Sequence, residues 1–454
     1  MSNKFSVSGV GFCFLHYLCG TSYFLAKYNG TNRYWLDIDK LSPTERAKID
    51  EAINSSQSFR KRDAAWQALN RGIIDIEETK NLDLSSLPSP TVEEEYRFLR
   101  RWFNPIWLCY TFFLRIVTLH NPVVEAHGFI KSFKVKRVNL YGQYIERSDF
   151  DTFNSKLVQS EPFVSVVIPT LNRYDYLYDV MRDLEQQNYK NFEVIVADQS
   201  EPVDISFYEQ FDLDLTLIQQ KEKALWLARN TCIKRSKGDY LLLYDDDSRV
   251  DPDWIQQHLK CLDYFQVNIS SGVSLSVIGG KIPSDYRYFR WSGQIDTGNV
   301  MLRKDVFHKV GLFDRQFEKQ RMGDGEFGLR CHINDLKNIS NPRAKRVHLK
   351  AGKGGLRQIG SWDGFRPKGW LAPRPVPSVL YLCRSYFGDR ASLLMLLRSV
   401  PPSIIPYQFK SNKLFLIIGW IISIFLLPLI AYQVISSWKR SSRMITEGPK
   451  IQSL

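Results

Sequence analysis

Between residues 163 and 244, short apolar runs alternate with segments whose apolar residues recur at helical spacing. The runs are residues 163–168, 192–197, 213–218 and 239–244. Between the first two, apolar residues repeat at the intervals of an amphipathic helix: Tyr176, Leu177, Val180, Met181 and Leu184. Strands that alternate with helices predict βαβ units and a parallel sheet covered on both faces. The pattern therefore predicts an α/β fold for this part of the chain.

Polar residues follow three of the predicted strands. Residues 169–173, Asp198 and the aspartate triplet 245–247 each come directly after an apolar run. Ligands of such a sheet bind beyond the carboxyl ends of its strands, so these residues are expected to share one edge and form a site. Adjacent carboxylates repel one another, and a divalent metal, an arginine or a lysine usually keeps them ionised. Metal-bound pyrophosphate is one interpretation of the triplet. A solvated turn before a helix that begins near residues 251–252 is the other.

Composition places limits on the size of the core and on the partners. The chain has 454 residues, of which 44% are hydrophobic and 13% aromatic, enough for a large core and two or three folded units. Its net charge of +13 suggests an anionic partner, which could be nucleic acid, acidic lipid or a nucleotide diphosphate. The seven cysteines form no CxxC pair, so a reducing cytoplasm fits best.

One segment has the character of a membrane helix. Residues 414–434 are dominated by Leu, Ile, Phe and Trp over about 20 residues, the length that crosses a bilayer. Trp420 and Trp438 resemble interfacial anchors, although a buried core helix is the alternative. The preceding residues 393–407 are apolar but broken by prolines, which favours an interfacial position. Residues 5–26 could be mistaken for a signal peptide, but a strand or packed helix is favoured there.

These patterns divide the chain into six predicted segments. The first is a partly helical module, in which residues 42–45 form a capping box. The segments are 1–90, an N-terminal module; 91–160, a helical and aromatic connector; 161–350, the α/β domain; 351–390, a basic segment rich in Gly and Pro; 391–438, a membrane-associated or transmembrane segment; and 439–454, a basic tail.

The motifs of the α/β segment resemble those of family 2 glycosyltransferases, which have the GT-A fold. The resemblance covers roughly residues 160–350, and it rests on many pieces in the family's order. These are residues 164–173, 196–200, Ala228-Arg229-Asn230, Gly238-Asp239, Asp245-Asp246-Asp247, Gly298-Asn299, 311–314 and 323–330. The implied fold is a Rossmann-like, mostly parallel sheet flanked by helices, here with an N-terminal helical module and a C-terminal membrane-associated helix.

The resemblance implies a nucleotide-sugar donor held with Mg²⁺ or Mn²⁺. Asp245 and Asp247 correspond to the family's DxD pair, and His348 is a candidate third metal ligand. Asp246 is expected to point into the fold and serve only structure. The implied donor-binding residues are Pro169, Asn172, Arg173, Asp198, Arg229 and Asp245. For Arg229 an exposed helix arginine, and for His348 a structural histidine, are the alternatives.

The family's catalytic base is the second acid of a Glu-Asp pair, and Asp324 occupies that place. Gly323 stands where the family usually has Glu, which is a departure. An inverting single displacement is still implied. Glu326 is a nearby rival or auxiliary acid, or else a carboxylate stabilised by a helix N-terminus. Trp362 is a candidate for stacking on a sugar, with ordinary packing as the alternative.

The resulting hypothesis is a membrane-associated, metal-dependent glycosyltransferase whose catalytic domain faces the cytoplasm. Its partners would be a nucleotide-sugar donor, a glycan or lipid-linked acceptor of cell-surface polysaccharide synthesis, and the membrane through the C-terminal segment, with no nucleic acid. Two alternatives stay open. One is a membrane scaffold with an inactive transferase-like domain, which the Gly323 departure favours. The other is a two-metal nucleic-acid enzyme, which would also use clustered aspartates and a basic chain.

Overall fold

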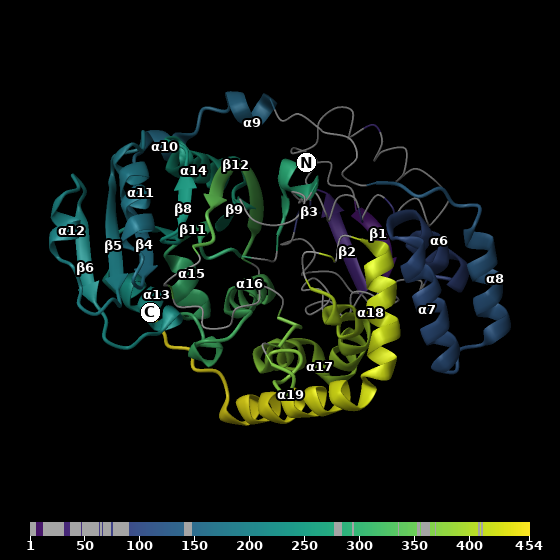
Figure 1. Cartoon of the computed structure of the whole chain (residues 1–454). Coiled ribbons are helices and arrows are strands. Elements are labelled where there is room, and N and C mark those ends of the chain that lie inside the picture. The colour runs from purple at the N-terminus through teal and green to yellow at the C-terminus, as the bar shows by residue number, and fades with distance from the viewer. Residues whose placement is uncertain are drawn as a thin grey trace. The chain divides into compact units, whose positions relative to one another are not determined.

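The computed structural model divides the chain into two compact units. Unit 1 comprises Met1–Ile145 and Tyr386–Arg398, and unit 2 comprises Glu146–Ser385 and Ser399–Leu454 (Figure 1). The structure describes residues 6–11, 31–36, 47, 63, 66, 74–75, 90–139, 148–276, 284–292, 295–334, 336–351, 355, 364–367, 369–406, 409 and 412–454.

Unit 2 is built on one mixed sheet whose strands run in the order β10-β12-β9-β11-β7-β4-β5-β6, with β8 paired to β12. The strands are β4 (Val164–Thr170), β5 (Phe192–Asp198), β6 (Leu215–Gln219), β7 (Tyr240–Tyr244), β8 (Ser248–Val250), β9 (Ile269–Ser276), β10 (Arg290–Trp291), β11 (Asn299–Arg303) and β12 (Asn338–His348). Strands β7, β4, β5 and β6 are parallel, as the alternating pattern predicts. The predicted α/β architecture is thus confirmed.

The other half of the sheet makes it mixed. Strand β11 lies antiparallel to both β7 and β9, while β12 is parallel to β9 and antiparallel to β8 and β10. Apart from β11, these strands carry many polar residues, including Ser270, Ser271 and Asn341, so no apolar run marks them in the sequence. The sequence therefore predicts the parallel half and misses the antiparallel pairings.

Helices pack on this sheet and bury its core. The main ones are α11 (Tyr174–Glu185), α13 (Leu225–Arg235), α14 (Trp254–Phe265), α15 (Asp305–Val310) and α16 (Gly323–Ile333). Strands β4 and β5 are buried along their whole length, as expected for central strands covered on both faces. Apolar residues of α11 and α14, such as Leu177, Val180 and Leu259, join those strands in one core.

Unit 1 contains α6 (Val92–Trp102), α7 (Pro105–Val117) and α8 (Pro122–Ser132), with strands β1 (Ser6–Gly11), β2 (Thr31–Leu36) and β3 (Ile74–Asp75). The guanidinium of buried Arg115 pairs with Glu95 and Glu125, and the Tyr96 hydroxyl donates to Glu125 over 2.7 Å. Strand β1 lies within residues 5–26, where a strand or a packed helix is expected. The capping box at residues 42–45 and most of its module lie outside the described residues.

The C-terminal part of unit 2 includes η6 (Pro401–Ile404), α18 (Lys413–Phe425) and α19 (Leu427–Glu447). Residues 414–434 are two helices instead of the single one expected. Pro428, which lacks an N–H, lies at the start of α19, and the two axes are bent by 88°. Within the described residues no single helix has the length and apolarity to cross a membrane, and this bent pair meets those criteria only when taken together.

Asn299 holds three strands and α14 together from inside the core. Its side-chain oxygen accepts from Trp254 Nε1 at 2.8 Å and from His258 Nε2 at 3.0 Å. Its amide nitrogen donates to the carbonyls of Val273 and Ala344, both at 3.1 Å. Asn299 is fully buried, so all of its hydrogen-bonding capacity is used where an unpaired polar group would be costly.

Acid should destabilise unit 2 through His258. Burial lowers the pKa of this fully buried imidazole to about 4, against the hydrogen bonds to Asn299 and Ser270, which raise it. The unfolded chain binds this proton near pH 6.5, so His258 contributes no penalty above pH 6.5. As the pH falls from 6.5 towards 4, the free energy of unfolding decreases by about 1.4 kcal/mol per pH unit, because the unfolded chain takes up this proton and the buried imidazole does not. Between pH 7 and pH 5 we expect about 2 kcal/mol of destabilisation from this residue.

Urea unfolding of wild type and His258→Gln at both pH values measures this contribution. The variant should be less stable at pH 7, and its loss between pH 7 and pH 5 should be smaller than that of wild type by about 2 kcal/mol. Equal losses in the two proteins would contradict the assignment to His258.

Candidate active site

The acidic triplet lies next to the end of β12. Residues 245–247 directly follow β7, and β8, which comes next, pairs with β12 so that Ser248 faces His348. The Leu349 amide also donates to the Asp247 carbonyl over 2.9 Å. Strand pairing therefore brings Arg346 and His348 to the triplet, at the carboxyl edge of the sheet where the sequence predicts a site.

Two buried arginines hold the Asp245 carboxylate. Arg229 Nη2 donates to Oδ1 over 2.7 Å, and Arg346 Nη1 donates to Oδ2 over 2.8 Å. Each arginine side chain is only 2% exposed. Arg229 also donates to the Thr297 carbonyl over 3.1 Å. The alternative of an exposed helix arginine is therefore wrong for Arg229.

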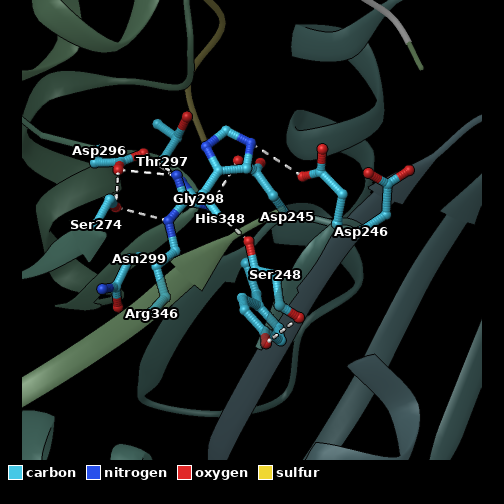
Figure 2. Close-up of polar contacts among 12 residues, drawn as sticks. Asp245, Asp246, Ser248, Ser274, Asp296, Thr297, Gly298, Asn299, Arg346 and His348 are labelled. Carbon is cyan, nitrogen blue, oxygen red and sulfur yellow. Dashed lines mark hydrogen bonds and ion pairs between the residues drawn. The ribbon is translucent and has the colours of Figure 1, made fainter. Parts of the chain in front are cut away.

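Arg346 connects Asp245 with a further acid, Asp296 (Figure 2). Its Nη2 lies 3.0 and 2.9 Å from the two Asp296 oxygens, and its Nε donates to Ser274 Oγ over 2.7 Å. Burial alone would raise the pKa of Asp296, but the Arg346 charge and hydrogen bonds from Ser274 and Gly298 outweigh it, and the pKa is lowered. The Asp296 carboxylate is consequently held ionised.

Gly298 lets the backbone approach this arginine. A Cβ atom at this position would lie 2.1 Å from both Arg346 Nη1 and Asp245 Oδ2. Any other residue would thus have to displace the ion pair. The sequence motif Gly298-Asn299 combines this close approach with the core hydrogen bonds of Asn299.

Asp246 points into the fold, as expected from the sequence. Its carboxylate accepts from Thr170 Oγ1 and from Arg173 Nη1, both at 2.9 Å, and the residue is 5% exposed. Burial raises its pKa to about 6, and the neighbouring Arg173 charge opposes that rise. Asp246 thereby anchors the loop that carries Arg173.

Asp247 and His348 complete a group that fits a hard divalent cation. His348 Nε2 lies 3.2 Å from Asp247 Oδ1, while Arg173 Nη1 and the Ala351 amide donate to Oδ2. Burial raises the pKa of Asp247, but the contacts with His348 and Arg173 prevail and lower it. One ligand atom from each of Asp245, Asp247 and His348 lies within 4.8 Å of the others. Carboxylate oxygens keep spare lone pairs beside their arginine contacts, so the donor set suits Mg²⁺ or Mn²⁺.

A cavity of about 370 Å³ lies beside the arginine network. Its polar lining includes Arg229, Asp296, Asp324, Arg346 and His348. Further lining residues are Leu225, Trp226, Ser271, Gly272, Val273, Ser274, Tyr286, Arg290, Ser292, Thr297, Phe317, Lys319, Gln320, Arg321, Met322, Ser340 and Gly364. The structure therefore brings the expected base and the expected third metal ligand to one cavity.

The first turn of α16 explains the departure at Gly323. A Cβ atom on Gly323 would lie 2.3 Å from Trp226 Cζ2 and 3.0 Å from Phe317 Cβ. The Trp226 indole, whose Nε1 donates to the Phe317 carbonyl over 3.1 Å, occupies the space that a larger side chain would need. The glycine is thus a packing requirement of this chain, and it leaves Asp324 in place.

The segment after β4 contacts Gly355, which belongs to the predicted basic segment 351–390. The Gly355 amide donates to the Leu171 carbonyl over 2.8 Å, and a Cβ on Gly355 would lie 2.4 Å from Arg173 Cζ. Asn172 has a positive φ of 52°, and its amide donates to Ser200 Oγ over 2.8 Å. Arg173 and Asn172 are therefore brought to the edge of the site. Pro169 is buried within β4.

Asp198 is fully buried at the end of β5. Its Oδ2 accepts from the hydroxyls of Tyr174 and Tyr208, each at 2.7 Å, and its Oδ1 accepts from the Ser200 amide at 2.8 Å. Through these hydrogen bonds the carboxylate orders the loops after β4 and β5. Its role in reading a nucleobase stays a prediction.

Two predicted auxiliary residues, Glu326 and Trp362, remain to be placed. Glu326 is 2% exposed and pairs with Arg330 one turn further along α16, with contacts of 2.9 and 3.0 Å, and it does not line the cavity. Trp362 lies outside the described residues. Within the described residues, Asp324 is the carboxylate of α16 that lines the cavity.

Arg346 was not predicted from the sequence as a site residue. A signal was present, because residues two apart on a strand point to the same face, and Arg346 precedes His348 by two. Asp296 and Trp226 carried no comparable signal. Their positions depend on tertiary contacts.

Comparison with known proteins identifies the class. Residues 165–313 match the model of the family described as glycosyl transferase family 2. The chain thus carries a glycosyltransferase domain of family 2, and the predicted family is confirmed. O-antigen biosynthesis protein RfbC of Myxococcus xanthus is 24% identical over 264 residues, which are 48% of this chain and 20% of that protein. Amylovoran biosynthesis glycosyltransferase AmsB of Erwinia amylovora is 28% identical over 182 residues, which are 34% of this chain and 60% of that protein.

The chain spans between a fifth and three fifths of the length of these two relatives. Among solved structures, S. aureus TarS 1-349 in complex with UDP-GlcNAc matches with a TM-score of 0.42 and 15% identity. This match covers 60% of this chain and 82% of that one. The mannosyltransferase PcManGT from Pyrobaculum calidifontis, in complex with GDP-Man and Mn²⁺, matches with a TM-score of 0.38 and 15% identity. It covers 66% of this chain and 84% of that one.

The packing of Gly323 against Trp226 can be tested by adding one methyl group. Gly323→Ala should lower the free energy of unfolding by about 1–3 kcal/mol, because the new Cβ overpacks against a rigid indole. Gly325→Ala is the matched control, since its Cβ would meet only the flexible Met322 Cε at 3.3 Å. Thermal and urea unfolding of both variants provide the measurement. Equal stability of the two variants would contradict this account of the departure.

Proposed function

We propose that the protein transfers a sugar, with inversion, from a nucleotide-sugar to a glycan or lipid-linked acceptor in polysaccharide synthesis. The observation that carries the proposal is the grouping of Asp245, Asp247 and His348 beside a cavity that Asp324 lines. The family 2 domain supports the reaction class. The words "O-antigen biosynthesis" and "amylovoran biosynthesis" in the names of two relatives support polysaccharide as the product class.

The donor diphosphate fits the side of the cavity where the triplet lies. Asp245, Asp247 and His348 would hold the divalent cation, which when bound neutralises the leaving diphosphate as a Lewis acid. Arg229 and Arg346, which line the same cavity, hold Asp245 in position from both sides. Arg173 fixes Asp247 from the loop after β4. These fixed charges orient the donor without further rearrangement.

Asp324 is the base of the proposed reaction. An inverting transfer needs one carboxylate that accepts the proton of the acceptor hydroxyl as its oxygen attacks the anomeric carbon from the face opposite the diphosphate. The bond to the diphosphate oxygen breaks in the same displacement, and the proton ends on the Asp324 carboxylate. Asp324 lies in the first turn of α16. This turn is held rigidly, because Gly323 lies in close contact with the Trp226 indole.

Two observations weigh against the scaffold alternative. Gly323 has a packing cause, and the proposed base and the group that could hold a metal both lie around one cavity. Four carboxylates, of which those of Asp246 and Asp247 are buried, are held there by three arginines, an arrangement that a scaffold would not need. The nucleic-acid enzyme is disfavoured by the family of the domain.

Replacing the base should remove turnover while leaving donor binding intact. Asp324→Asn should lower kcat by about 10²–10⁴-fold with a small change in KM, because the acceptor proton loses its base. The measurement is release of nucleoside diphosphate from a panel of nucleotide-sugars with Mn²⁺. Asp305→Asn, at a half-exposed acid of α15 outside the cavity, is the control and should retain wild-type rates. Wild-type rates in Asp324→Asn would refute the assignment.

The metal group can be tested without turnover. Removing one ligand by Asp247→Asn or by His348→Ala should weaken Mn²⁺ binding by roughly 10–100-fold or more, as losses around metal sites do. Electron paramagnetic resonance of free Mn²⁺ measures the affinity, and Asp305→Asn is again the control. Unchanged Mn²⁺ affinity in both variants would place the metal elsewhere.

A further inference from the structure

The surface of α18 and the first half of α19 carries large exposed apolar side chains. Ile424, Phe425 and Leu427 at the bend between the helices are 70%, 80% and 60% exposed. The same face continues along both helices through Leu414, Phe415, Ile417, Ile421, Tyr432 and Ile435. A contiguous apolar face of this kind on a folded unit marks an interaction surface.

The opposite face of α19 is polar and is already bound to unit 2. Gln433 Nε2 donates to the Trp370 carbonyl over 2.6 Å, and Arg374 Nε donates to Gln433 Oε1 over 2.9 Å. One turn on, Ser437 donates to the Pro375 carbonyl over 2.6 Å. These side chains are buried, so α19 is an integral part of the unit that carries the cavity. Moving it into hydrocarbon would break these hydrogen bonds.

The chain returns to the same unit after α19. The Lys450 amide donates to Asp314 Oδ1, and the Leu312 amide donates to the Gln452 carbonyl, both over 2.8 Å. Gly311, with φ of 78°, leaves room for Ile451, which a Cβ there would meet at 2.6 Å. Figure 1 shows the chain turning from the end of α19 to the C-terminus near α13 and α15. The C-terminal end of the bent pair is thus tied to the rest of unit 2.

The charged residues in the sequence of this segment are of one sign. Exposed Lys439, Arg440 and Arg443 follow the apolar half of α19. Residues 399–446, which belong to unit 2, contain five Lys or Arg residues and no acid. An apolar helix face bordered by cations is typical of a helix that lies in the interface of an anionic bilayer.

We propose that this face of α18 and α19 binds the surface of an anionic lipid bilayer as a monotopic anchor, without crossing it. The bend and the apolar side chains enter the interface, and the cations meet lipid headgroups. The polar face of α19 keeps its hydrogen bonds to unit 2. The anchor thereby holds the cavity close to the membrane, and it does not depend on the proposed reaction.

A second copy of the chain fits this face less well. In a two-fold dimer the same patch meets itself, so helices that run antiparallel would place Lys439 and Arg440 against the apolar half of the partner. Helices that run parallel would place the cations against one another. An anionic headgroup layer meets both the apolar and the cationic parts favourably.

Vesicle flotation of the full chain tests the proposal. Wild type should bind vesicles that contain roughly 30% phosphatidylglycerol, and less well at high salt. The pair Ile424→Ser and Phe425→Ser should weaken binding by roughly tenfold or more, because two large side chains no longer enter the interface. Replacing Lys439, Arg440 and Arg443 by Gln should abolish the preference for anionic over neutral vesicles. Ile205→Ser, which removes another exposed isoleucine of unit 2, should bind like wild type.

The absence of crossing is tested by labelling single cysteines at Asn412 and Glu447, before and after the bent pair, with Cys13, Cys19 and Cys109 changed to Ser. A membrane-impermeant maleimide added outside vesicles should label both positions equally. Labelling of only one would show that the pair crosses and would overturn the proposal. It would also be overturned if the serine pair floated like wild type, or if that pair only converted a dimer into a monomer. Thermal unfolding confirms that each variant is folded.

Discussion

The site depends on one buried guanidinium group, that of Arg346. It joins Asp245, at the end of β7, to Asp296, in the loop before β11, and it lies on β12 two residues before His348. Three segments that are distant in sequence are therefore fixed by a single side chain. Removing one partner of a buried ion pair costs about 3–5 kcal/mol, because the remaining charge stays buried without compensation. The glycine at position 298 follows from the same contact, since no other residue leaves room for it.

The charges around this arginine are nearly balanced. Four carboxylates, those of Asp245, Asp246, Asp247 and Asp296, face three guanidinium groups, those of Arg173, Arg229 and Arg346. The arginines allow the acids to stay ionised at close range, although burial raises the pKa of Asp246 to about 6. A diphosphate would add negative charge to a set that already carries a small excess of it. The grouping of Asp245, Asp247 and His348 provides a place for the cation that such a ligand needs.

The sequence predicted the parts of the structure that local patterns specify. The runs that form β4, β5 and β7 are apolar and β-branched or leucine-rich, so the parallel half of the sheet and the position of the triplet at its edge could be read directly. Strand β12 could not, because Asn338, Ser340 and Asn341 are polar and become buried only through their partners on β9. The positions of Asp296 and Trp226 likewise depend on contacts between distant segments. So do the two hydrogen bonds that Asp198 accepts from tyrosine hydroxyls. The helix expected over residues 414–434 proved bent, although Pro428 gave a signal for it.

A crystal structure of the protein with Mn²⁺ and a nucleoside diphosphate tests the central claim most directly. The account predicts the metal between Asp245, Asp247 and His348, the diphosphate on that metal, and Asp324 across the adjoining cavity. It further predicts that Arg346 still joins Asp245 and Asp296. A diphosphate bound elsewhere, or a metal that leaves these three residues uncoordinated, would contradict it.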